Sequence, residues 1–112
     1  MTRYLISFDD GTMIIPEEDL GKVGEGSRKV VREAKDAGVW IFGAGLLTQQ
    51  ASIVATDGTI TDGPYPETKA VLGGFSIIEV PTREAALAWA AKLAAACRCA
   101  QEVREIMYDP ES

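Results

Sequence analysis

The segment TDGPYPETKAVLGGF, residues 61–75, gathers turn-forming residues, acids and a lysine between two apolar runs. Asp62 opens a Gly-Pro turn, and Lys69 follows on the same segment. A carboxylate in such a turn either accepts hydrogen bonds from its own backbone or points into a neighbouring cleft, where burial tunes its pKa for proton abstraction. We therefore consider Asp62 a candidate general base, with turn capping as its alternative role. Lys69 is a candidate ligand-binding cation, with solvent exposure as its alternative.

A hairpin signal just before this segment predicts the orientation of Asp62. Asp57-Gly58 lies between two alternating runs, which is typical of a two-residue type I′ turn. Extending that register along the strands pairs Ile53 with Asp62, and opposed residues share a face. The sequence therefore predicts that the Asp62 side chain lies on the apolar side of the hairpin.

Ser27 is the second candidate catalytic residue, because it is a hydroxyl within an apolar helical stripe. Its side chain either faces a pocket or caps a helix that begins only at Arg28. The stripe consists of Leu20, Val23, Val30, Val31 and Ala34.

Three more residues are candidates for ligand binding. Arg104, on the last predicted strand, has the charge to orient an anion, and pairing with Glu102 on the same face is its structural alternative. Gly74 and Phe75 lie near the start of the predicted strand 72–80, where the missing Cβ of a glycine lets a ligand approach the backbone. A β-bulge is the structural alternative for Gly74.

Histidine is absent, which excludes Ser-His-Asp and Cys-His catalysis and every metal site that needs histidine. Cys97 and Cys99 alone cannot close a zinc site. We expect two free, partly buried thiols, no metal and no cofactor.

The composition points away from several classes of protein. The chain has 112 residues, which suits a single domain over 1–112, and 11 basic against 17 acidic residues give a net charge of −6. Binding to nucleic acid or to an anionic membrane requires clustered positive charge, so neither partner is expected. No apolar run reaches the roughly 18 residues that span a bilayer. The N-terminus lacks the pattern of a signal peptide, and we expect a cytoplasmic protein.

The elements that position these residues follow from periodicity and turn signals. Their order is strand, helix, strand with hairpin, strand, helix, strand, which is the ferredoxin-like βαββαβ arrangement with an extra β-hairpin. This predicts an α+β fold with an antiparallel sheet. The predicted ranges are 3–8, 17–37, 39–47 (a buried strand), 52–61 (the hairpin), 72–80, 83–97 and 102–108.

The strands are apolar on both faces, whereas two helices can cover only one face of the sheet. The other face needs a partner, and a second copy of the chain is the simplest one. We therefore expect a homodimer.

Several segments of the sequence resemble a known protein family. DGPYPETK followed by LGGF resembles the defining motif of the YCII-related family, also called DGPF-domain proteins, with Tyr65 where that family usually has Phe. The segments EAALAWA and EVREI are also similar to that family. The resemblance implies a ferredoxin-like domain that forms a dimeric α/β barrel-like assembly, with a ligand cleft at the dimer interface.

The resemblance also implies where chemistry would occur. Related members are argued to be enzymes because a histidine on the first helix lies near an aspartate; some are linked to dehydrochlorination of aromatic compounds, and others to alternative sigma factors. The position of that histidine falls on Ser27, so the dyad cannot exist here.

Two functions stay open. In one, the protein is a cofactor-independent lyase or isomerase that uses Asp62 as general base, while Ser27 and Arg104 orient a small anionic or aromatic molecule. In the other, it is a non-catalytic ligand-binding or regulatory interaction module, for example a partner in a sigma-factor-linked system.

Overall fold

The computed structural model of the chain describes residues 1–9, 14–47, 51–62 and 72–112. Its elements follow the predicted order, with one short 3-10 helix before the first α-helix. They are β1 (Thr2–Asp9), η1 (Glu17–Asp19), α1 (Leu20–Asp36), β2 (Trp40–Gly45), β3 (Ser52–Val54), β4 (Ile60–Asp62), β5 (Leu72–Val80), α2 (Arg83–Cys97) and β6 (Glu102–Glu105).

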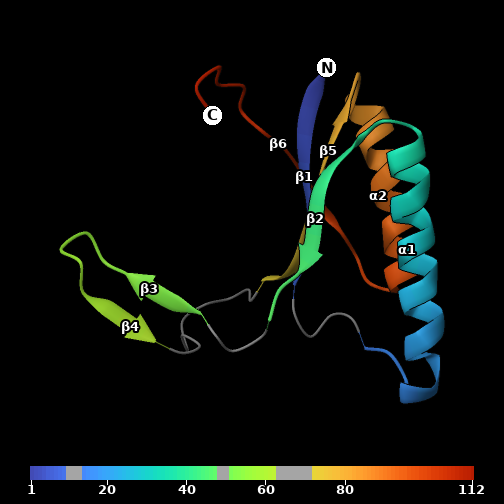
Figure 1. Cartoon of the computed structure of the whole chain (residues 1–112), viewed down its shortest axis with the longest axis horizontal. Helices are drawn as coiled ribbons and strands as arrows, with labels where there is room; N and C mark the ends of the chain where they lie inside the picture. The colour runs from blue at the N-terminus through green and yellow to red at the C-terminus, as the bar shows by residue number, and fades with distance from the viewer. Residues whose placement is uncertain (10–13, 48–50, 63–71) are drawn as a thin grey trace.

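Four strands form one antiparallel sheet in the order β2-β5-β1-β6, and β3 pairs with β4 in a separate two-stranded sheet. Both helices lie on one side of the four-stranded sheet (Figure 1). The predicted α+β class, the antiparallel sheet and the extra hairpin are therefore confirmed. The dimeric assembly stays a prediction.

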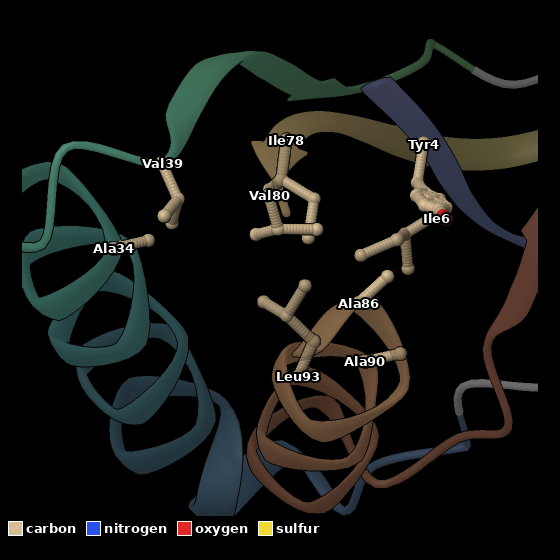
Figure 2. Packing of buried hydrophobic residues seen from close by; sticks show 9 residues of the cluster. All are labelled: Tyr4, Ile6, Ala34, Val39, Ile78, Val80, Ala86, Ala90 and Leu93. Atoms are coloured by element: carbon tan, nitrogen blue, oxygen red, sulfur yellow. The ribbon is translucent and has the colours of Figure 1, made fainter. Parts of the chain in front are cut away.

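The core lies between the sheet and the helices, and Figure 2 shows how its side chains point toward one another. Tyr4 and Ile6 of β1 and Ile78 of β5 meet the inner face of α2 there. Two alanines, Ala86 and Ala90, are buried on that face of α2, and their small side chains allow the helix to approach the strands closely. The same cluster includes Ala34 of α1, which ties both helices to one core.

Local chemistry sets two of the helix ends. Gly38, just after α1, has φ +75°, a left-handed conformation that favours glycine. At the start of α2, the Thr82 Oγ1 accepts a hydrogen bond from the backbone N–H of Ala85 at 3.1 Å. Each helix end is therefore set by a residue directly beside it.

Two strand predictions were wrong in detail. The strand predicted as buried is β2, but β2 lies at an edge of the sheet and most of its residues are exposed. The apolar run of β2 is therefore not buried on both faces, because part of it lies on the sheet face opposite the helices, which is exposed in the single chain. The last strand ends at Glu105, so Tyr108 lies beyond it.

The hairpin register was also wrong, by one residue. The Gly58 N–H donates to the Ala55 carbonyl at 2.9 Å, and Gly58 has φ +88°. The loop therefore has three residues with glycine in the left-handed position, rather than the predicted two-residue turn. Asp62 pairs with Ser52 instead of Ile53. Asp62 therefore shares its face of the ribbon with Val54 and Ile60 rather than with Ile53.

The face of the sheet that the helices leave uncovered is called the open face below. Strand register places Leu5, Phe42, Phe75 and Ile77 on it, because opposed residues share a face. The rings of Phe42 and Phe75 lie 5.9 Å apart, centroid to centroid. The hairpin extends from the sheet on the side of this open face (Figure 1). Within the described ranges, no helix has the length and apolar character needed to cross a membrane.

Candidate functional site

A cavity of about 360 Å³ lies on the helix side of the sheet, where α1, α2, β1, β2 and β5 meet. Two of the predicted site residues, Ser27 and Phe75, are among its lining residues. β5 reaches the cavity at Phe75 through its backbone, since the register puts the ring on the open face. The lining residues are Phe8, Ser27, Val31, Lys35, Trp40, Gly43, Ala44, Gly45, Phe75, Ser76, Leu93 and Cys97.

Two glycines shape the sheet side of this cavity. A Cβ on Gly43 would lie 2.7 Å from the indole ring of Trp40, and a Cβ on Gly74 would lie 2.8 Å from the ring of Phe8. Each ring therefore occupies the space that a side chain on the glycine would need. The space at Gly74 that we expected to admit a ligand holds the Phe8 ring instead. Both rings line the cavity and give it an aromatic boundary.

Ser27 lies in the middle of α1, so the interpretation that it caps a helix starting at Arg28 was wrong. Its Oγ donates a hydrogen bond to the Gly24 carbonyl at 3.0 Å, which satisfies the hydroxyl proton locally. The oxygen retains acceptor capacity. Ser27 is half-buried at the cavity wall, and its catalytic role stays a prediction.

Lys35 is a lining residue that the sequence interpretation missed. Ser27, Val31 and Lys35 follow one another at i, i+4 and i+8, which puts them on one face of α1. That spacing was the signal in the sequence. Lys35 forms no ion pair with another described residue, so its charge stays available to a ligand.

The same helix face continues outward into a shallow groove of about 310 Å³. Ser27, Val31 and Lys35 line both the groove and the cavity, and Arg28 and Arg32 add two guanidinium groups to the groove. Arg32 donates to the Glu25 carboxylate at 2.8 Å, which lowers the pKa of Glu25. The pair with Glu25 compensates the charge of Arg32, whereas Arg28 and Lys35 form no ion pair with another described residue.

Cys97 brings a thiol to the cavity wall from the end of α2. Burial raises the pKa of Cys97, and the nearby charge of a Cys99 thiolate raises it further. The thiol form therefore dominates at neutral pH. Neither cysteine forms a disulfide with another described residue; Cys97 is half-buried and Cys99 is buried.

Asp62 lies apart from this cavity within one chain. It is exposed at the end of β4, and its carboxylate accepts a hydrogen bond from the Ser52 hydroxyl across the hairpin. Arg104 lies on β6 with its side chain on the open face, 2.7 Å from Glu102, so the predicted ion pair is confirmed. Lys69 lies outside the described residues. The structure thus brings Ser27 and the backbone of Phe75 to one cavity but not Asp62 or Arg104, and the site roles of all four stay predictions.

A comparison with models of protein families shows to which family the chain belongs. The model of the YCII-related domain matches residues 4–108, which is nearly the whole chain. The chain belongs to the YCII-related family. A comparison with curated proteins found no match for this YCII-related chain.

Family membership connects the cavity to the resemblance in the sequence. Ser27, the position to which the sequence resemblance assigns the histidine of related members, lines the cavity with its hydroxyl. A hydroxyl with an ordinary pKa cannot serve as a base at neutral pH without a neighbour that takes its proton. Within the described ranges, no group of three or more Cys, Asp or Glu residues could hold a metal ion. The described lining residues offer hydrogen bonding, charge pairing, aromatic contact and the thiol of Cys97.

Proposed function

We propose that this YCII-related domain binds a small organic anion with an apolar, aromatic body in the cavity between α1 and the sheet. The observation that carries this proposal is the combination of an aromatic and aliphatic boundary with one cation, Lys35. Apolar walls with a few well-placed polar groups are typical of ligand sites. The cavity volume of about 360 Å³ suits a molecule of roughly one ring with substituents.

Each lining residue has a separate role in the proposed complex. Lys35 pairs with the anionic group, at the boundary with the cationic groove of Arg28 and Arg32. Ser27 Oγ accepts a hydrogen bond from a donor on the ligand. Trp40 and Phe8 contact the apolar body through their rings, which prefer offset or edge-to-face contact with another ring.

Binding without turnover is the first form of this proposal, as in a ligand-binding or regulatory interaction module. It is supported by the absence of any carboxylate among the described residues that line the cavity. A cofactor-independent lyase or isomerase that uses Asp62 is the second form. It is supported by the accessibility of Asp62, whose carboxylate is exposed and held by one neutral hydroxyl.

A homodimer in the cytoplasm completes the proposal. The open face exposes Phe42, which is 56% accessible in the single chain, and a second copy would cover it. Two cysteines that form no disulfide with a described residue support a reducing compartment. Neither nucleic acid nor a membrane is proposed as a partner, since the net charge of −6 disfavours both.

Nuclear magnetic resonance titration with benzoate, phenylacetate, salicylate and neutral benzamide tests the binding proposal. We expect millimolar concentrations of the three carboxylates to shift resonances of Trp40 and Val31, because fragments of this size bind weakly. Lys35→Met should weaken carboxylate binding about tenfold, as the loss of one charge pair is worth about 1.4 kcal/mol.

Lys29→Met is the matched control for Lys35→Met, because Lys29 is exposed on the same helix and does not line the cavity. It should leave binding unchanged. Equal binding by wild type and Lys35→Met, or stronger binding of benzamide than of benzoate, would contradict the proposed anion site.

A further inference from the structure

Exposed apolar side chains gather on the hairpin of β3 and β4. Val54 is 65% exposed and Ile60 is 64% exposed, and the two face each other across the ribbon. Ile53, on the opposite face, is 47% exposed. A two-stranded hairpin without further cover is marginally stable in water. Both faces of this hairpin therefore expose apolar surface that a folded assembly would bury.

The hairpin lies away from the body of its own chain. All residues from 51 to 62 are exposed, although they are part of a chain with a well-packed core. The radius of gyration is 15.7 Å. A compact domain of this length has a radius of gyration of about 13 Å. The hairpin is therefore an arm rather than a packed layer of one chain.

The arm and the open face lie on the same side of the molecule (Figure 1). The segment after β6 extends on that side as well, and its Met107 and Tyr108 are 87% and 86% exposed. A second copy that covers the open face would therefore lie between two segments that carry exposed apolar side chains.

Interface size distinguishes a face-only contact from one that includes the arm. Four strands of about seven residues give a face of roughly 430 Å², so two faces bury about 850 Å², less than the 1,200–2,000 Å² of stable interfaces. One side of the arm measures about 160 Å², and two arms with their receiving surfaces add about 640 Å². The total of about 1,500 Å² reaches the usual range.

We infer that the β3–β4 hairpin is an arm that packs its Val54 and Ile60 face against a second copy of this chain. This inference rests on the proposed homodimer and specifies how it is built. In a dimer with twofold symmetry, the arm of each copy packs against the other copy, so the contact between arm and partner occurs twice. A second copy is the favoured partner for the arm, because two copies of this chain supply both the exposed arm and the exposed face. Together these surfaces reach the buried area of a stable interface.

The arm has a consequence for Asp62. Asp62 pairs with Ser52 on the same face of the ribbon as Val54 and Ile60, since these positions alternate with Ile53 and Thr61. Packing of that face brings the Asp62 carboxylate to the contact between copies. The Asp62 carboxylate of one copy would then lie at the open-face side of the other copy, on the side of the sheet opposite the helix-side cavity.

Gel filtration with light scattering on three variants tests the arm. Val54→Asp with Ile60→Asp puts two charges on the arm face and should raise the dimer dissociation constant at least tenfold. Phe42→Asp puts a charge on the open face and should weaken the dimer in the same way. Leu87→Asp, at an exposed apolar position on α2, is the matched control and should stay dimeric.

The outcomes separate the arm from the homodimer itself. A wild-type chain that is monomeric at micromolar concentration overturns both. A dimer that Phe42→Asp dissociates and the arm variant does not retains the homodimer and overturns the arm.

Hydrogen exchange on the wild type gives an answer that does not depend on a variant folding. Amides of residues 52–62 should be protected at high protein concentration and lose protection on dilution below the dissociation constant. Protection that does not change on dilution would mean that the hairpin packs on its own chain, which overturns the arm.

Discussion

The indole ring of Trp40 lies against Gly43, three residues along the same strand, where a Cβ would stand 2.7 Å from Cζ2 and Cη2. The register of β2 against β5 shifts between Trp40 and Phe42, which is the irregularity of a bulge. The bulge lets Trp40 and Gly43 lie on the helix side of the sheet while Phe42 lies on the open face. One short strand therefore supplies both the aromatic wall of the cavity and the exposed ring of the open face.

Gly43→Ala should destabilise the protein by about 1–3 kcal/mol, as overpacking in a fixed site does. The added methyl would meet the Trp40 ring and also the Phe75 backbone oxygen at 2.9 Å, and a backbone atom in a paired strand cannot move away. Urea unfolding measures the loss. Gly45→Ala is the matched control on the same strand, where no atom lies within 4 Å of the new Cβ. Equal stability of both variants would contradict the close packing of Trp40 on Gly43.

Asp62→Ala should change the free energy of unfolding by less than about 0.5 kcal/mol, because Asp62 is exposed and its one described partner is the exposed Ser52. Asp62→Asn should behave alike, since the amide oxygen still accepts from the Ser52 hydroxyl. Denaturant melts of the two variants, each compared with wild type, measure this. A loss of 2 kcal/mol or more in Asp62→Ala would mean that the carboxylate supports the fold. Loss of carboxylate-ligand binding in both variants at unchanged stability would support a role in the site.

The order of elements and their boundary signals could be predicted from local chemistry. Gly38 ends α1 and Thr82 caps α2 because each acts within a few residues of itself. The helix stripe likewise identified Val23 and Ala34 as buried. These predictions required no knowledge of which elements meet.

The hairpin register and the cavity depend on information that the sequence does not carry locally. Asp57-Gly58 fits both a two-residue and a three-residue loop, and the choice between them decides whether Asp62 lies opposite Ile53 or opposite Ser52. The contact of Phe8 with Gly74 joins residues of two paired strands, β1 and β5. It can be recognised only once the register of β1 against β5 is known. For the same reason, Lys35 became a site residue only once α1 was seen to lie against β2.

Asp57 should control the order of the hairpin turn at low pH. Hydrogen bonds from Thr59, first from its side chain and then from its backbone N–H at 2.9 Å, hold the pKa of Asp57 below its ordinary value. The pKa of Asp57 is lower in the folded protein than in the unfolded chain, where it is about 3.9. The stabilisation that the Asp57 carboxylate gives to the turn is therefore fully present above pH 3.9, and it is lost as the pH falls through the folded pKa. The Thr59 amide resonance should therefore titrate below pH 3.9. Asp57→Asn keeps the acceptor oxygen and should abolish the titration; a midpoint at or above 3.9 in the wild type would contradict the bond.

Cys97 should react slowly with a thiol reagent at pH 7–8, because burial and the nearby Cys99 raise its pKa and the thiolate is the reacting form. Cys99→Ser removes the neighbouring charge and should speed labelling of Cys97. Benzoate bound in the cavity should slow it, since Cys97 lines that wall.

The same shift predicts how stability depends on pH. The pKa of Cys97 is higher in the folded protein than in the unfolded chain, where it is about 8.5. The contribution of the protonated Cys97 thiol to the free energy of unfolding is therefore fully present below pH 8.5, and it is lost as the pH rises through the folded pKa. Urea midpoints between pH 7 and 10 should therefore fall more steeply for wild type than for Cys97→Ser. Rapid labelling at pH 7, together with equal pH slopes for the two proteins, would show that the thiol is not buried against the cavity as the structure places it.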